Sequence, residues 1–160
     1  MRLLIIILCF CAHFTCMSSP RAFTMHNKGK IVKLYLLPSL RETRIAVYPY
    51  KAEYNAGIEV EIVGVVGNAL QIKIGDEILY CHKGNLAVNT RNYDGAEFIL
   101  YKSPDKDSKV SGRSSREQTV CIYNVSHDWL FVKGEDDRGN PIEGWLPPEI
   151  QCSSLWTPCN

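Results

Sequence analysis

The residues of this chain that could do chemistry are few, and the first pair is a thiol beside an imidazole, Cys81-His82. A cysteine hydrolase needs a nucleophile and a base that the fold brings together, usually with a third residue that orients the base. Cys81 aligns with Trp145 inside a predicted strand, and 160 residues leave no room for a separate catalytic domain. A strand cysteine beside a surface histidine is therefore favoured over a nucleophile.

Two further polar pairs fit turns better than chemistry. His127-Asp128 falls where the first of two related stretches has the hairpin signal Gly67-Asn68, and Asp136-Asp137 falls in a charged loop. No Cys-x-x-Cys or His-x-x-x-His spacing occurs, which argues against a zinc site. We therefore expect no catalytic residue, no metal and no cofactor.

The elements that would position these residues begin after an apolar leader. Residues 3–16 are almost wholly apolar and follow Arg2, which is typical of a secretory signal peptide and too short to span a bilayer. We assign residues 1–18 to the signal peptide and residues 19–30 to a flexible lead-in. A lipid anchor at Cys16 is an alternative, although the preceding Ala-His-Phe-Thr matches such a tether poorly. Either way the mature chain leaves the cytoplasm.

Four of the seven cysteines remain after the leader, namely Cys81, Cys121, Cys152 and Cys159. An even number in an exported chain permits disulfides. A bridge between Cys152 and Cys159 would close a small C-terminal loop and stabilise the fold by about 2–3 kcal/mol. For Cys81 and Cys121 two readings stay open, a disulfide or burial as small apolar side chains.

The charge of the chain limits its partners. The sequence carries 18 basic and 17 acidic side chains, and removal of Arg2 with the leader balances them. A neutral protein has no broad field that would attract nucleic acid or an anionic membrane. We therefore expect neither partner, and no membrane span.

Two stretches, residues 58–86 and 118–150, share one pattern of apolar positions. Apolar and polar residues alternate along each, as in strands with one buried and one solvated face. No helical periodicity is evident. The chain is therefore predicted to be all-β, with one scaffold repeated. The matched pairs are Val60 with Val120, Ile62 with Ile122, Leu70 with Leu130, Ile72 with Val132, Ile78 with Ile142 and Leu86 with Ile150.

Turn-rich residues 89–95 separate the two copies. We place one small domain at residues 31–88, a second at residues 97–151, and a tail with the possible disulfide loop at residues 152–160. Each domain has only about 60 residues, so packing of one copy on the other would help to stabilise both.

The second copy resembles a bacterial Src-homology-3-like domain in an ordered set of short motifs. The resemblance implies two small antiparallel β-barrels in tandem, without catalysis, in an exported bacterial protein of the periplasm or cell surface. Such domains commonly bind cell-wall peptides or position a partner enzyme. The first copy diverges, with Ala69 in the place of Trp129. The motifs are Leu100-Tyr-Lys-Ser-Pro104, Ser108-Lys-Val-Ser-Gly112, Thr119-Val120, Trp129-Leu-Phe-Val-Lys133 and Glu143-Gly-Trp-Leu146.

Strand periodicity predicts an aromatic face on the second copy only. Leu130 and Val132 align with core positions of the first copy, so Trp129 and Phe131 should point outward. Exposed rings in a cluster indicate a contact surface. The alternative is a seam in which the rings pack against the first copy or against the tail. The predicted ligand-binding face comprises Tyr101, Tyr123, Trp129, Phe131 and Trp145.

These observations favour a non-enzymatic binding module of the cell envelope that recognises a cell-wall peptide or an envelope protein. The first alternative is a periplasmic inhibitor or immunity-type protein that binds and blocks an enzyme. The most remote is a thiol hydrolase that uses Cys81.

Overall fold

The computed structural model describes residues 19–25, 31–47 and 57–155. Within these ranges the protein consists of antiparallel β-strands and two short 3-10 helices, which confirms the all-β prediction. Over the same ranges no helix has the length and apolar character needed to cross a membrane. The predicted signal peptide lies outside the described residues.

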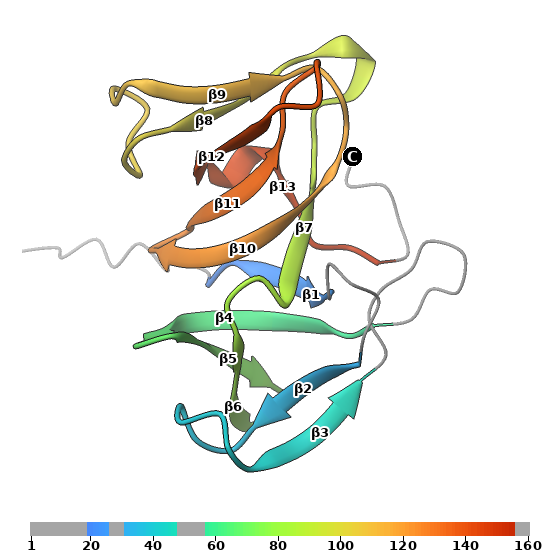
Figure 1. The fold of residues 1–160 in the computed structure, drawn as a ribbon, viewed down its shortest axis with the longest axis vertical. Helices are drawn as coiled ribbons and strands as arrows, with labels where there is room; N and C mark the ends of the chain where they lie inside the picture. The colour runs from blue at the N-terminus through green and yellow to red at the C-terminus, as the bar shows by residue number, and fades with distance from the viewer. Residues whose placement is uncertain (1–18, 26–30, 48–56, 156–160) are drawn as a thin grey trace, which may run out of the picture.

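Ten of the described strands form two sets of five, on either side of a central pair (Figure 1). Along the sheet the order is β3-β2-β6-β5-β4-β1-β7-β10-β11-β12-β8-β9, open at both ends. The first set is β2 (Val32–Tyr35), β3 (Thr43–Val47), β4 (Glu59–Val66), β5 (Ala69–Ile74) and β6 (Glu77–His82). The second set is β8 (Phe98–Tyr101), β9 (Val110–Ser114), β10 (Thr119–Ser126), β11 (Trp129–Glu135) and β12 (Pro141–Leu146). The central pair is β1 (Arg21–Thr24) and β7 (Leu86–Thr90).

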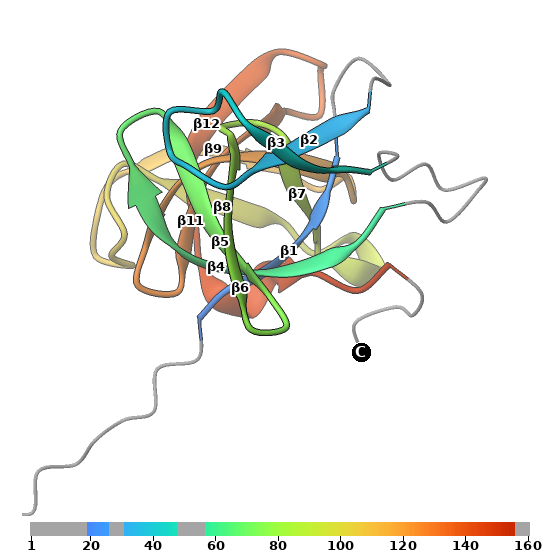
Figure 2. The same ribbon diagram turned by 90° about the horizontal axis from the view of Figure 1, so that it is seen from below.

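The two sets repeat the same strand register. Ile62 pairs with Ile72 between β4 and β5, and Ile122 pairs with Val132 between β10 and β11. In both hairpins the register shifts directly after the first of these residues, so a β-bulge recurs at the same point. Repetition of a local irregularity, and not only of apolar spacing, supports a duplicated scaffold. Figure 2 shows the first set facing the viewer, with β2 and β3 side by side.

Two predicted equivalences along β6 and β12 are wrong by a single residue. Lys73 pairs with Ile78 whereas Lys133, the counterpart of Lys73, pairs with Glu143, so Ile78 does not match Ile142. By the same slip Cys81, which pairs with Leu70, matches Leu146 and not Trp145, because Leu146 pairs with Leu130. A one-residue slip moves a side chain to the opposite face of a strand. Ile78 is accordingly 41% exposed, and Leu79 takes the buried position. The slip arises because the β11–β12 loop is longer than the β5–β6 turn, which hid the offset in the sequence.

Residues 21–24 form the central strand β1, which corrects the expectation of a flexible lead-in over this segment. Ala22 pairs with Val60 of β4, as Val88 of β7 pairs with Val120 of β10. β1 also pairs with β7, so the two strands join the sets into one continuous sheet. Ala22, the aromatic Phe23 and Thr24 are fully buried. The backbone of β1 therefore contributes hydrogen bonds on both edges, and its side chains contribute to the core.

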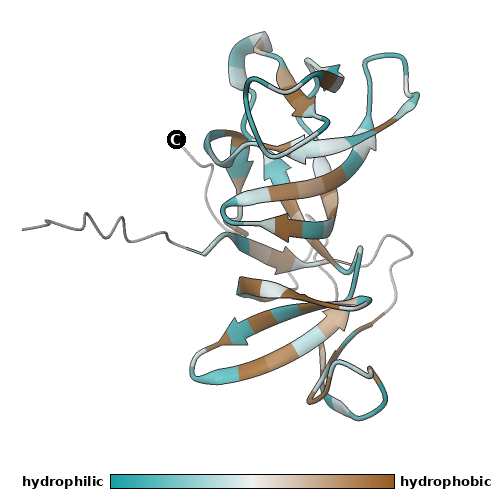
Figure 3. Ribbon diagram, turned by 90° about the vertical axis from the view of Figure 1, so that its left-hand side faces the viewer, coloured by the Kyte–Doolittle hydropathy of each residue, from teal (hydrophilic) through white to brown (hydrophobic). Residues whose placement is uncertain are grey.

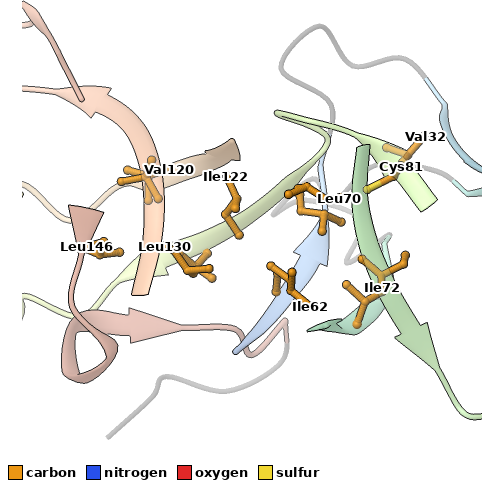
Figure 4. Close-up of a cluster of buried hydrophobic side chains, with 14 of the residues drawn as sticks. Val32, Ile62, Leu70, Ile72, Cys81, Val120, Ile122, Leu130 and Leu146 are labelled. Carbon is orange, nitrogen blue, oxygen red and sulfur yellow. The ribbon is translucent and has the colours of Figure 1, made fainter. Parts of the chain in front are cut away.

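One hydrophobic core runs through both sets (Figure 4). Ile122 and Leu130 from the second set lie toward Ile62 and Leu70 from the first, and all four are buried. Figure 3 shows the alternation of apolar and polar residues along the strands that gives each strand its buried face. Burial of a side chain of this size contributes about 1.5–3 kcal/mol, so the shared core couples the two sets.

The last described residues, 151–155, pack against the central pair of strands. The 3-10 helix η2 (Pro148–Ile150) leads into β13 (Gln151–Cys152), which pairs with β7. Leu155 packs against Phe23 and Ala87, and its backbone N–H donates a hydrogen bond of 3.0 Å to Glu59 Oε1.

The cysteines of the described residues are in two states. Cys152 is disulfide-bonded, whereas Cys81 and Cys121 are free thiols. Of the two readings for Cys81 and Cys121, a disulfide between them is therefore not formed. Cys159 lies outside the described residues, so its bridge to Cys152 stays a prediction.

Candidate functional site

Four of the five predicted face residues come together on three neighbouring strands. Trp129 and Phe131 lie on β11, Trp145 lies on β12 opposite Phe131, and Tyr101 lies on β8 opposite Trp145. Leu130 and Val132, which alternate with the two β11 rings, are fully buried. The four rings are half-buried and face outward, as the strand alternation predicts. We call Tyr101, Trp129, Phe131 and Trp145 the aromatic cluster.

The rings of the aromatic cluster pack in two edge-to-face pairs. The centroids of Tyr101 and Trp129 are 5.7 Å apart with planes at 83°, and those of Phe131 and Trp145 are 5.5 Å apart at 75°. Pairs with this geometry contribute about 0.5–1.5 kcal/mol beyond the area that they bury. The rings therefore support one another and form a preformed, half-exposed surface.

Tyr123, the fifth predicted residue, lies apart from the cluster at the junction of the two strand sets. Its ring lies so close to Gly84, in the β6–β7 turn, that a Cβ on Gly84 would meet it at 3.1 Å. The Gly84 N–H also donates a hydrogen bond of 2.7 Å to the Ile122 carbonyl. Tyr123 therefore packs in the seam between the two copies, which was the alternative to an exposed face. The other four rings contact one another in two pairs. The tail residue Trp156 lies outside the described residues.

Beside the aromatic cluster is an open pocket of about 450 Å³. Its polar residues include Ser111, whose Oγ donates a 2.8 Å hydrogen bond to the Glu143 carbonyl, and the exposed Lys102. The Glu143 carboxylate lies 3.0 Å from Lys133 Nζ, which in turn lies 4.9 Å from the centroid of the Tyr123 ring. The pocket is lined by Tyr101, Lys102, Ser111, Phe131, Pro141, Ile142, Glu143 and Gly144.

Sequence reasoning missed the polar part of this pocket. Lys102 directly follows Tyr101, but it belongs to a run of lysines and aspartates that indicates a solvated loop. Ser111 and Glu143 are far apart in sequence and meet only because β9 and β12 flank β8. The one signal in the sequence for this polar part was that Lys102 directly follows Tyr101, a predicted face residue.

The equivalent surface of the first set is polar. By register, Tyr35, Gln71 and Tyr80 stand where Tyr101, Phe131 and Trp145 stand in the second set. Gln71 Nε2 donates a 3.3 Å hydrogen bond to Tyr80 Oη, in place of the contact between the two rings. Ala69 occupies the place of Trp129. The first set thus keeps two tyrosine rings but lacks the two rings that Trp129 and Phe131 add on the second set.

The Cys81-His82 pair does not form a catalytic dyad. Cys81 is fully buried opposite Leu70, and desolvation raises the pKa of its thiol to about 12. His82 is exposed and packs edge-on against the Tyr35 ring, with centroids 5.6 Å apart. The thiolate is the nucleophilic form of cysteine, so this thiol is unsuited to attack at neutral pH.

Cys81 is expected to react with a thiol reagent at pH 8 about a thousandfold more slowly than an unfolded cysteine, because its pKa lies near 12 instead of 9.0. The unfolded chain releases this proton first, so the stability that the protonated thiol contributes is lost as the pH rises from 9 toward 12. Mass spectrometry of labelled peptides in native buffer and in urea measures the rate. Equal labelling in both conditions would contradict the buried assignment.

The other polar pairs act in turns. His127 adopts a left-handed φ of 55° between β10 and β11, as expected for a turn residue. Asp136 accepts hydrogen bonds from the Asn140 side chain and backbone and from the Arg138 N–H, and these bonds lower the pKa of its carboxyl. Over the described ranges, no group of three potential metal-ligating side chains is present.

Comparison with known proteins gives a sparse result. No family model matches the chain. No curated protein matches it. Among solved structures, NlpC1 and NlpC2 from Trichomonas vaginalis are similar, each with a TM-score of 0.36 and 15% identity. The first match covers 92% of this chain and 50% of that protein, and the second covers 86% and 49%. The chain thus spans about half the length of these two proteins.

Proposed function

We propose that this protein is a non-enzymatic binding module of the bacterial cell envelope, which recognises a cell-wall peptide or an envelope protein. The observation that carries the proposal is the aromatic cluster: four outward-facing rings gather beside an open pocket on the second set, where the first set has Ala69 and Gln71. Rings that pack in pairs and remain half-exposed form a ready contact surface.

We further propose that the two strand sets are Src-homology-3-like units in tandem. The support is the common register of β4–β5 and β10–β11, the bulge at the same place in both, and the ordered motifs of the second set. In this view the first unit keeps the scaffold, and the second unit carries the binding surface. Export through the leader would place the module outside the cytoplasm.

Complete burial of an exposed ring contributes about 1.5–3 kcal/mol, and because these rings are already half-buried, a ligand that covers one of them fully would gain about half of that. Each 1.4 kcal/mol changes a dissociation constant tenfold. A cluster of this size therefore suits reversible binding to an abundant ligand such as the cell wall. An enzyme partner of the inhibitor type would use the same rings as the centre of a larger interface.

The test replaces the rings with the residues that the first set carries at the same positions, Trp129→Ala and Phe131→Gln. Each change is expected to weaken binding to purified cell walls by about fourfold to tenfold, because the exposed half of one ring is removed from the contact. Co-sedimentation of the full secreted chain with cell walls measures this. The matched control is Gln71→Ala on the first set, which should bind as the unaltered chain does.

Outcomes other than the expected one are informative. Unchanged sedimentation of both ring variants would refute the proposal. Stoichiometric capture of one envelope enzyme, with no cell-wall binding, would select the inhibitor function instead. Circular dichroism of each variant checks that the sheet is intact, and the first set already shows that its hairpin accepts alanine and glutamine there.

A further inference from the structure

We infer that the pocket beside Tyr101 is a carboxylate-binding subsite, in which the Lys102 ammonium pairs with a carboxylate of a cell-wall peptide while the aromatic cluster contacts its apolar side chains. This inference rests on the proposed function and names the chemistry of its ligand.

The first argument is the charge of the lining. Glu143 is the acidic residue of the pocket, and its carboxylate is already neutralised by Lys133 at 3.0 Å. Lys102 is exposed and makes no ion pair with any residue that the structure describes. Of the other cations on β9 and on the β8–β9 loop, Lys106 and Arg113 pair with Glu149 and Glu97, and Lys109 does not line the pocket. The pocket therefore presents one uncompensated positive charge, which complements an anionic ligand.

The second argument is that the rest of the lining suits a peptide. The Ser111 hydroxyl is engaged with the Glu143 carbonyl, so it does not compete with Lys102 as a donor to an anion. Pro141, Ile142, Tyr101 and Phe131 supply apolar surface to the same lining as Lys102. An open pocket of about 450 Å³ whose lining combines one cation with apolar and aromatic side chains accommodates a carboxylate that lies close to an apolar side chain.

The third argument comes from the first set, which serves as an internal comparison. Tyr35 pairs with Tyr80 as Tyr101 pairs with Trp145, so Leu36 is the counterpart of Lys102. Leu36 is 45% exposed, so the position tolerates an apolar side chain. The first set keeps tyrosines at the positions of Tyr101 and Trp145, so the second set adds the Lys102 cation together with two rings, those of Trp129 and Phe131, at one place on a shared scaffold. A joint difference of this kind is expected if the cation and these two rings contact one ligand.

The experiment uses the full secreted chain and soluble muropeptides from purified cell walls, either untreated or with their carboxylates converted to amides by carbodiimide and ammonia. Isothermal titration calorimetry measures affinity. Lys102→Leu, which installs the residue of the first set, should weaken binding of untreated muropeptides about tenfold, because a charge-assisted contact is lost. Lys102→Arg should restore binding, and amidated muropeptides should bind the unaltered chain as weakly as untreated ones bind the leucine variant.

Lys109→Leu is the matched control, since Lys109 is an exposed lysine of the same loop that does not line the pocket. If Trp129→Ala loses binding while Lys102→Leu binds normally, the carboxylate subsite is overturned and the proposed function stands. If Lys109→Leu loses as much affinity as Lys102→Leu, the positive charge of the whole loop attracts the ligand without a contact in the pocket. The carboxylate subsite is then overturned as well. If the unaltered chain binds no muropeptide, the carboxylate subsite and recognition of a cell-wall peptide both fall, and the proposed function is left with an envelope protein as its ligand.

Discussion

Replacement of Phe23 with alanine is expected to lower the free energy of unfolding by about 3–5 kcal/mol. Phe23 is fully buried in β1 and packs with Ala87 and Leu155. Its removal leaves a cavity at the strand that joins the two sets, and the neighbouring backbone is fixed by pairing to β4 and β7. Because this backbone is fixed, the neighbouring residues can fill little of the cavity. The loss of unfolding free energy therefore lies at the upper end of the range for core substitutions.

Urea denaturation of the protein, followed by tryptophan fluorescence, measures the change. Arg21→Ala is the control, because Arg21 is exposed on the same strand and should shift stability by less than about 0.5 kcal/mol. Domains of this size have a total stability of about 5–15 kcal/mol, so Phe23→Ala should remove a large part of the stability of the protein. Equal midpoints for the two variants would show that β1 is not part of the folded sheet.

Gly144→Ala is the second substitution with a large expected effect, a loss of about 3 kcal/mol or more. A Cβ at this position would overlap Ser111 Oγ, and it would meet the Tyr101 carbonyl at 2.8 Å and Leu100 Cβ at 3.0 Å. Because backbone of β8 is among these contacts, rotation of a side chain cannot relieve the overlap. β12 and β8 must move apart, which also displaces Tyr101 from Trp145.

The matched control is Gly64→Ala in β4, where the new Cβ would meet only Gln71 Oε1 at 3.4 Å, an ordinary contact. Thermal unfolding of both variants separates a local overlap from a general penalty for alanine in a strand. Gly144→Ala should also weaken the cell-wall binding that we propose, since the pocket wall and the aromatic cluster share this strand pair. A Gly144→Ala midpoint equal to that of Gly64→Ala would contradict the close packing of β8 on β12.

The aromatic cluster shows how far strand alternation alone can locate a site. Trp129 and Phe131 could be placed on the outer face because Leu130 and Val132 match core positions of the first copy, and a period of two leaves no other choice. Tyr123 could not be separated from them in this way. It occupies the bulge of β10, where alternation breaks, and its position depends on contact with Gly84 of the other set.

The N-terminal strand and the β12 register illustrate a different limit. Residues 21–24 carry too few apolar positions to be recognised as a strand, and they become one because two open strand edges accept them. The slip of β12 against β6 follows from the length of the β11–β12 loop. The register across a loop and the partner of a strand edge both depend on long-range pairing, and local propensity does not encode them.

The sequence by itself determined the all-β class, the duplicated core pattern and the outward direction of the β11 rings, since each follows from side-chain alternation within a single strand. Only the tertiary structure decided that β1 joins the two sets, that Tyr123 belongs to their junction, and that Lys102 and Glu143 border one pocket with Tyr101. These features depend on which strands become neighbours, and that choice is made by burial of a shared core across residues far apart in the chain.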